Sequence, residues 1–177
     1  MAVTGGLEGP LHCGKVVMWL NLPAWCIGIT NLILIPAVHI TVSWFFEKKV
    51  RRDVFQPDRF PLRTFGWEKD RRVYETFFRV KQWKDCVPDG AKWVGGFEKS
   101  RLRESSKVFL EDFRKETCRG ELAHWVQMVF LWAFVIWNPG IAAGIMLVYG
   151  ALSNLPCIII QRYNRCRLER VLLRHSL

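Results

Sequence analysis

Apolar residues gather in two long runs, and basic residues gather beside them. Residues 16–46 and 122–161 carry no charged side chain, whereas residues 47–120 and 162–177 are rich in Lys and Arg. A helix of about 20 apolar residues is long enough to cross the ~30 Å hydrocarbon core of a bilayer. This alternation predicts an all-α membrane protein rather than an ordinary soluble domain.

The first apolar run is longer than one crossing requires. Residues 16–46 would extend ~46 Å as a single helix, and Pro23 and Pro36 offer places to break or bend it. We therefore interpret residues 16–22 as an interfacial or re-entrant lead-in, and residues 24–46 as the first transmembrane helix.

The second apolar run predicts a tight helical hairpin over residues 121–161, because Asn-Pro-Gly at 138–140 is a strong turn signal. Positive charge favours the cytoplasmic side of a membrane. We expect residues 47–120 and 162–177 to be cytoplasmic, with the N-terminal 15 residues and the hairpin tip outside. Three transmembrane helices in a multi-pass protein of the cell membrane satisfy both placements.

The basic middle segment is too polar to cross a bilayer but contains many aromatic residues. Its run "RRVYETFFRVKQWKD" (71–85) predicts an amphipathic helix, and residues 99–118 predict another. The first helix fits either the anionic membrane surface or the core of a small soluble subdomain. With a net charge of +10 placed beside apolar runs, the expected partners are membrane lipids and not nucleic acid.

Glu121 and His124 stand at the entrance to the second apolar run, three residues apart on one helical face. Counted from Pro139, His124 lies fifteen residues before the turn and Asn154 fifteen after it, so the two should lie at similar depth on facing helices. Gln161 is expected near Glu121. The pattern favours a polar cluster at the inner membrane interface.

A Glu–His pair suits general-base catalysis, with His124 as the base and Glu121 orienting its ring. Asn154 and Gln161 would then help to bind the reacting carbonyl or hydroxyl group. The alternative is structural, because Glu at a helix start complements the helix dipole and His at a helix end reaches the interface. For His39, in the first apolar run, helix packing or hydrogen bonding is favoured over catalysis.

The exit of the hairpin, "QRYNRCRLERVLLR", is rich in arginine. Arg162 and Arg165 either anchor the chain to lipid phosphates or, together with Lys84, hold the phosphates of an acyl donor. Tryptophans such as Trp83, Trp93 and Trp125 either flank an acyl chain or sugar or serve as interface anchors. The cysteines form no CxxC pair, so neither a metal site nor a disulfide framework is predicted.

The runs "VKQWKDCVPDG", "ETCRGELAHW" and "NLPCIIIQRYNRCRL", with "FGWEK", resemble the family of glycosyl-4,4′-diaponeurosporenoate acyltransferase over roughly residues 65–168. The enzyme of that family attaches a fatty acyl chain to the sugar of a carotenoid glycoside. The resemblance implies an acyl group as cargo, and Cys166 stands where the family pattern has proline. The matching positions include Lys84, Trp83, Glu121, His124, Trp125, Gln161, Arg162, Tyr163, Asn164 and Arg165.

We therefore predict a membrane acyltransferase of carotenoid or lipid metabolism that moves a fatty acyl chain onto a hydroxyl of a lipid-like or glycosylated isoprenoid acceptor. Tyr163 and Asn164 are counted among the substrate-binding candidates. No bound cofactor is expected, since acyl-CoA or another acyl donor would be a co-substrate. The alternatives are a non-catalytic lipid-binding or assembly subunit and a lipid-to-lipid transacylase or esterase. A homo-oligomer or a partner enzyme of the same pathway is expected because three helices make a thin bundle.

Overall fold

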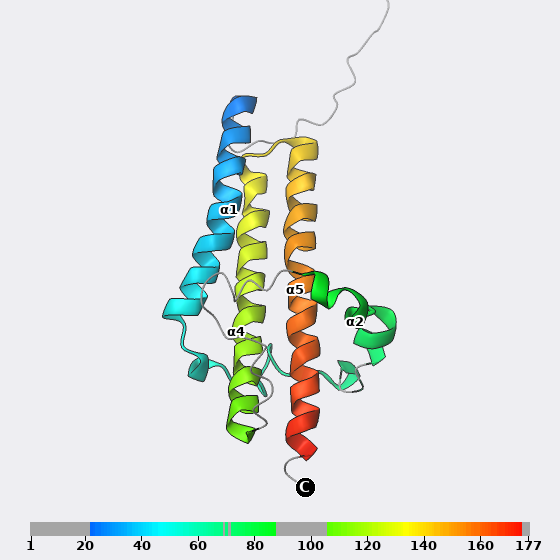
Figure 1. Ribbon diagram of the computed structural model, residues 1–177. Helices are drawn as coiled ribbons and strands as arrows, with labels where there is room; N and C mark the ends of the chain where they lie inside the picture. The colour runs from blue at the N-terminus through cyan, green and yellow to red at the C-terminus, as the bar shows by residue number, and fades with distance from the viewer. Residues whose placement is uncertain (1–21, 69, 71, 88–105, 175–177) are drawn as a thin grey trace, which may run out of the picture.

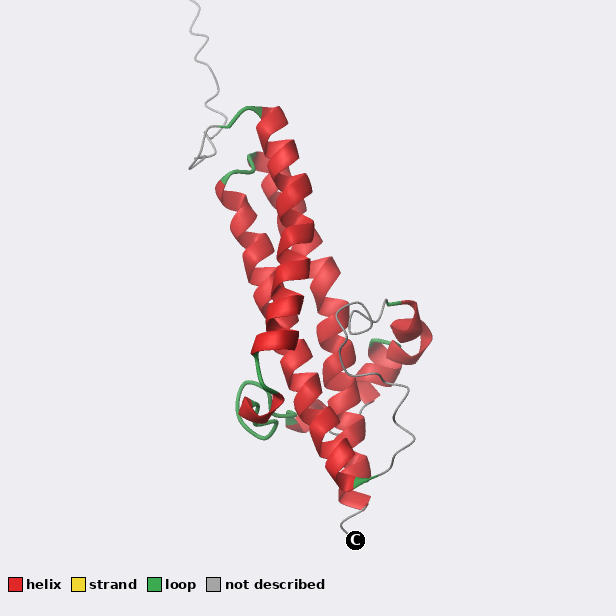
Figure 2. Cartoon of the chain, turned by 60° about the vertical axis from the view of Figure 1, so that its left-hand side comes forward, coloured by secondary structure: helices red, strands yellow, loops and turns green. Residues whose placement is uncertain are grey.

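The computed structural model describes residues 22–68, 70, 72–87 and 106–174, and every regular element in those ranges is helical. Three long helices lie side by side and form an elongated bundle (Figures 1 and 2). They are α1 (Ala24–Lys49), α4 (Lys107–Trp132) and α5 (Gly140–Arg174). The short elements are η1 (Arg52–Val54), η2 (Gly66–Glu68), the π-helical turn η3 (Val73–Phe77), α2 (Val80–Trp83), η4 (Lys84–Cys86) and η6 (Ala133–Ile136).

Helices α4 and α5 are antiparallel neighbours and share the most extensive contact in the bundle (Figure 1). Two glycines permit their close approach. A methyl group at Gly120 would lie 2.9 Å from Nε2 of Gln161, and one at Gly150 would lie 3.0 Å from the ring of Trp132. Both distances are shorter than ordinary van der Waals contact. A larger residue would displace the end of the Gln161 side chain at Gly120 and would push the Trp132 ring by a few tenths of an ångström at Gly150.

Helix α1 runs along the upper half of the bundle and packs mainly on α4 (Figure 1). Its range contains the first crossing expected over residues 24–46, while residues 16–21 of the lead-in lie outside the described part. The last carbonyl groups of a helix have no partner within it. Here Arg119 of α4 donates to the carbonyls of Phe46 and Glu47 and to the Glu47 carboxylate, which ties the end of α1 to α4.

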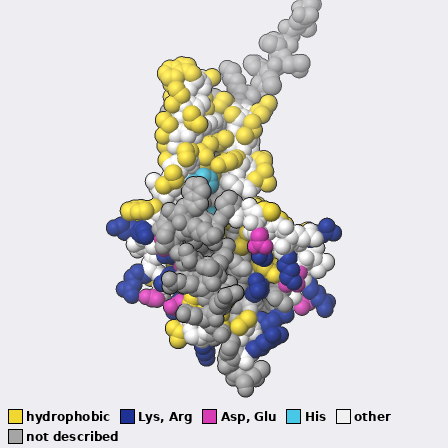
Figure 3. Space-filling model, viewed as in Figure 1, with side chains coloured by type: hydrophobic (Ala, Val, Ile, Leu, Met, Phe, Trp, Pro, Cys, Tyr) yellow, Lys and Arg dark blue, Asp and Glu magenta, His cyan; other side chains and the backbone are white. Residues whose placement is uncertain are grey.

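Hydrophobic and charged side chains occupy opposite halves of the molecule (Figure 3). Helices α1 and α5 are each long and apolar enough to cross a bilayer. The third predicted crossing is not established in this way, because the first half of α4 carries charges such as Glu116 and Glu121, and the regular α-helix ends at Trp132. By length and composition, the structure thus supports two of the three predicted crossings.

The prediction of a single amphipathic helix over residues 71–85 is wrong. The chain there forms η3, α2 and η4 in succession, and it breaks at Arg79, which has a left-handed backbone with φ of 49°. Tyr74 and Val80 are buried against Ile160, Tyr163 and Cys166 of α5. The core-facing alternative therefore describes this segment better than a helix lying on the membrane surface.

The predicted helix over residues 99–118 is present from Lys107 onward, and residues 99–105 lie outside the described part. Ser106 caps it by accepting a hydrogen bond from the backbone N–H of Phe109 at 3.3 Å. The helix continues through Gly120 into the apolar run without a break. Helix α5 likewise extends past residue 161, so residues 162–174 of the predicted C-terminal tail are the last turns of one long helix.

Candidate functional site

His124 and Asn154 meet across the contact between α4 and α5. Nδ1 of His124 lies 3.2 Å from Oδ1 of Asn154, which agrees with their equal distance from the turn. Asn154 is fully buried, whereas His124 keeps partial exposure. The pair thus combines a restrained imidazole with access from outside the bundle.

A second histidine, His39 of α1, lies close to this pair. Nδ1 of His39 lies 3.4 Å from Oε1 of Gln127, and its Nε2 lies 3.4 Å from the Tyr149 hydroxyl. Gln127 is buried and donates to the backbone carbonyl of His39 and to the hydroxyl of Ser43. Gln127 follows His124 by three residues, so the two share one face of α4. His39 and His124 therefore lie at the same level of the bundle. Together with Gln127 and Asn154 they form a hydrogen-bonded layer, called the histidine layer below.

Glu121 does not face His124 in this arrangement. Its Oε1 accepts a hydrogen bond from Arg162 at 2.7 Å and a long one of 3.5 Å from the indole of Trp125, and its Oε2 accepts from Arg165. Arg165 also donates to the hydroxyl of Thr117 and to the carbonyl of Leu62. The carboxylate is 2% exposed, so its charge is balanced by two guanidinium groups rather than by an imidazole.

Glu68 extends this charged network from the segment that crosses α4 and α5. Arg162 donates to both of its oxygens at 2.7 Å, and Tyr74 and the backbone N–H of Phe65 donate to it as well. Burial would raise the pKa of Glu68, but the hydrogen bonds from Arg162 and Tyr74 outweigh it and hold that pKa below its usual value. Burial, reinforced by Glu68, raises the pKa of Tyr74.

The arginines predicted to hold donor phosphates are already occupied. All three guanidinium nitrogens of Arg162 donate to carboxylate or carbonyl oxygens of the protein, and Arg165 is 1% exposed with the partners given above. Lys84 lies on a different element, where it pairs with Asp85 at 2.5 Å. The structure does not bring these three cations together around a common anion site.

The remaining predicted site residues divide between the core and the surface. Tyr163 is buried and donates to Glu75, and Trp83 donates to the carbonyl of Phe78. Trp125 is 40% exposed. Gln161 and Asn164 are both half-buried, and Gln161 lies against Gly120. Trp93 lies outside the described residues.

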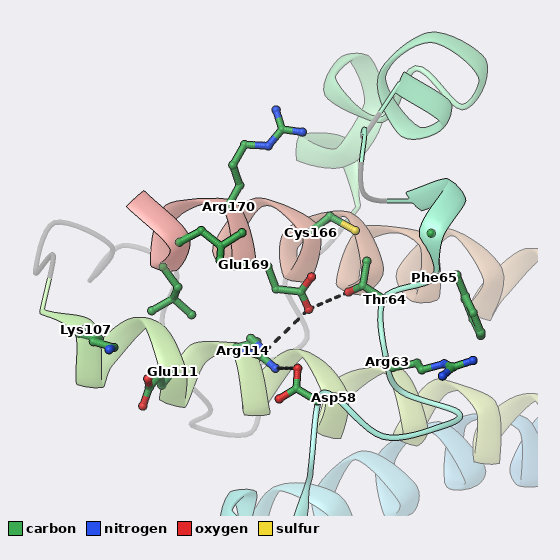
Figure 4. Close-up of a pocket in the computed structure, with 13 residues that line it drawn as sticks. Asp58, Arg63, Thr64, Phe65, Lys107, Glu111, Arg114, Cys166, Glu169 and Arg170 are labelled. Atoms are coloured by element: carbon green, nitrogen blue, oxygen red, sulfur yellow. Dashed lines mark hydrogen bonds and ion pairs between the residues drawn. The ribbon is translucent and has the colours of Figure 1, made fainter. Parts of the chain in front are cut away.

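An open groove of about 820 Å³ lies between the first turns of α4 and the last turns of α5 (Figure 4). Arg114 pairs there with Asp58 and approaches Glu169 to 3.8 Å, and Glu169 also accepts from Thr64. The lining contains both cations and carboxylates. His124 is ten residues farther along α4 than Arg114, or ~15 Å, so this charge-balanced groove is separate from the histidine layer.

Comparisons with known proteins agree with the resemblance carried by the sequence motifs. The family model described as glycosyl-4,4'-diaponeurosporenoate acyltransferase matches residues 43–174. The chain belongs to this family. Because the match runs from the end of α1 to the end of α5, it includes His124, Asn154 and the Glu/Arg network, but not His39.

Individual relatives carry the same family description. A glycosyl-4,4'-diaponeurosporenoate acyltransferase of Staphylococcus aureus strain MRSA252 is 31% identical over 121 residues, which are 67% of this chain and 72% of the relative. The protein of strain bovine RF122 / ET3-1 is 30% identical with the same coverage, and that of strain USA300 is 31% identical over 63% of this chain and 67% of its own length. No solved structure matches the chain.

Three further polar residues of this acyltransferase-family chain were not predicted from the sequence: Gln127, Tyr149 and Glu68. Gln127 follows His124 by three residues inside an apolar run, and that spacing was a usable signal. Glu68 lies in the quoted motif "FGWEK", but nothing in its local sequence indicates that it meets Arg162, which is 94 residues away. The two apolar helices α1 and α5 fit association with a membrane.

Proposed function

We propose that the chain is an integral-membrane acyltransferase that transfers a fatty acyl chain to a hydroxyl group of a glycosylated isoprenoid. The observation that carries this proposal is the His124–Asn154 pair, in a chain from an acyltransferase family. His124 lies near the start of the uncharged run 122–161, where α4 changes from charged to apolar. An amphiphilic acceptor has its sugar at the same level of a bilayer. His124 is therefore well situated to meet an acceptor hydroxyl.

In the proposed membrane setting, α1, the apolar half of α4 with η6, and the apolar half of α5 each cross the bilayer. Basic side chains near the end of α1 and along the last turns of α5 favour the cytoplasmic side. The end of α1 that begins at Ala24 and the turn at 137–139 would then face outward. The charged halves of α4 and α5 would project into the cytoplasm.

The reaction requires one group that accepts and then returns a proton. Nε2 of His124 takes the proton of the acceptor hydroxyl while the hydroxyl oxygen attacks the acyl carbonyl carbon of a thioester donor. The new ester C–O bond forms, the C–S bond breaks, and the imidazolium gives its proton to the departing thiolate. No group of the protein becomes acylated, so the acyl chain passes directly between two bound substrates.

The charged network has a supporting role in this proposal. Glu121, Arg162 and Arg165 satisfy one another below the histidine layer and connect α4, α5 and the segment around Glu68. Both carboxylate oxygens of Glu121 are engaged by the arginines. The role of Glu121 as an orienting group for His124 therefore has no contact to support it here and stays a prediction.

The test is transfer by the purified full-length chain in liposomes that contain a glycosylated isoprenoid. One sample receives radiolabelled acyl-CoA, a second receives phospholipid with a labelled acyl chain, and a third contains the His124→Gln protein with both donors. We expect label on the acceptor from acyl-CoA in the first sample alone. Transfer from phospholipid alone would identify a lipid-to-lipid transacylase, and absence of transfer from either donor would favour an assembly subunit.

A further inference from the structure

The amide of Asn154 has its orientation dictated by its neighbours. Its Nδ2 lies 2.9 Å from the backbone carbonyl oxygen of Gly150 and 3.0 Å from the hydroxyl of Ser153. A carbonyl oxygen can only accept a hydrogen bond, so the NH₂ end of the amide must face Gly150. The Ser153 hydroxyl donates to the carbonyl of Tyr149 at 2.8 Å, which leaves its oxygen able to accept from Asn154.

This orientation decides the protonation state of the facing imidazole. Oδ1 of Asn154 points to Nδ1 of His124 at 3.2 Å. An amide oxygen has no proton to donate, so a hydrogen bond forms only when Nδ1 carries the hydrogen. In a neutral ring the lone pair then resides on Nε2. The buried amide therefore selects one of the two tautomers of His124.

We propose that Asn154 is the positioning residue of His124, holding its Nδ1–H so that Nε2 stays unprotonated as the base for the acceptor hydroxyl. This inference rests on the proposed function and replaces Glu121 by Asn154 as the group that orients the ring. A neutral amide suits the apolar layer, because it costs less to bury than a carboxylate. Among the titratable groups on the three helices, His39 of α1 and Tyr149 of α5 belong to this layer. Glu121 of α4 and Arg162 of α5 pair with each other below it.

The first test measures the tautomer itself and needs no turnover. The full-length protein is labelled with ¹⁵N-histidine in detergent micelles, and the His124→Ala spectrum identifies the His124 signals by difference. We expect the nitrogen shifts of an Nδ1–H imidazole in the wild type and a shift toward the Nε2–H form in Asn154→Leu. A wild-type His124 in the Nε2–H form, or an unchanged spectrum in Asn154→Leu, would overturn the proposal.

The second test separates positioning from simple packing. Asn154→Leu should lower kcat at least about tenfold, and up to the ~10⁴-fold that a wrong histidine tautomer costs a catalytic triad, with KM nearly unchanged. Asn154→Asp keeps an acceptor facing Nδ1, so it should retain the tautomer and recover much of kcat, with the acid limb of its pH–rate profile moved to higher pH. Equal losses in both variants would contradict the inference.

Asn138 provides a matched control at the other end of the bundle. It is 2% exposed, and its amide bonds to the carbonyl of Phe134 and to Asn31, ~20 Å from His124 along the helix. Asn138→Leu removes a buried amide in the same way and should lower the melting temperature, yet leave the His124 spectrum and the pH–rate profile unchanged. A His124 shift in Asn138→Leu as large as that in Asn154→Leu would mean that the shift reports general loosening.

The two tests keep this inference distinct from the proposed reaction. An Nδ1–H spectrum that is lost in Asn154→Leu, combined with no acyl transfer by the wild type, would refute the reaction and retain the orienting contact. Transfer that persists in Asn154→Leu with wild-type kcat would refute the positioning role alone. Should Asn154→Leu not fold, Asn154→Ser allows the same spectral comparison with a smaller side chain that does not reach Nδ1.

Discussion

Two polar clusters, about one helical turn apart on α4 and about two turns apart on α5, are built in opposite ways. The lower one joins Glu68 and Glu121 to Arg162 and Arg165, and every one of these charges has a charged partner. The upper one consists of neutral groups around His124 and His39, and its contacts are longer, between 2.9 and 3.4 Å.

The difference separates what supports the structure from what can react. Charges removed from water must be paired, and once they are paired they have little capacity left for a substrate. A neutral imidazole with one nitrogen engaged keeps a lone pair on the other nitrogen. Glu121, whose charge is paired with two arginines, is therefore better suited to holding helices together. The neutral His124 keeps a nitrogen lone pair for proton transfer.

The largest expected effect is on turnover, in His124→Gln. Loss of a general base lowers the rate about 10²–10⁴-fold. Gln keeps a polar side chain of similar size facing Asn154, so the melting temperature should stay close to that of the wild type. The measurement is transfer of labelled acyl groups alongside thermal unfolding in mild detergent. Full activity in a folded His124→Gln protein would remove the upper cluster from the chemistry.

Glu121→Leu should show the reverse pattern, with stability affected first. The change leaves Arg165, which is 1% exposed, without its carboxylate, and breaking one side of a buried ion pair costs about 3–5 kcal/mol. Denaturant unfolding of Glu121→Leu, Arg165→Leu and the double variant measures the coupling between the two residues. A Glu121→Leu protein with wild-type stability and no turnover would instead restore the catalytic role predicted for Glu121.

The charged cluster should also make the fold sensitive to acid. The pKa of Glu68 is lowered in the folded protein, so its contribution to the free energy of unfolding is complete above its unfolded pKa, near 4.5, and is lost as the pH falls through the folded value. Glu68→Gln should remove that part of the pH dependence. Unfolding measured between pH 3 and 7 checks this, and identical slopes in both proteins would contradict it.

The smallest effect is expected at the edge of the neutral cluster, in Tyr149→Phe. This change removes only the hydroxyl that lies 3.4 Å from Nε2 of His39, and one such hydrogen bond is worth about 0.5–1.5 kcal/mol. Turnover should fall less than tenfold. A loss as large as that of His124→Gln would show that His39 takes part in the reaction instead of supporting the layer.

Much of the fold could be predicted from the apolar pattern, and the reason is physical. Long uncharged runs must be buried in lipid or protein, and a three-residue turn forces its flanking helices to be neighbours. This reasoning correctly brought His124 opposite Asn154. It failed for residues 71–85, because local periodicity does not reveal that Arg79 adopts a left-handed conformation or that Tyr74 is buried on α5.

The candidate site was predictable in its depth but not in its pairing. Spacing along a helix gives the height of a residue, and so Glu121 and His124 were expected together. Which neighbour each side chain meets depends on how α5 and the segment around Glu68 are rotated and packed against α4. That packing decides that Glu121 pairs with the two arginines and that His124 contacts Asn154. Glu68 and Arg162 come from distant parts of the chain, so no local sequence pattern predicts their contact.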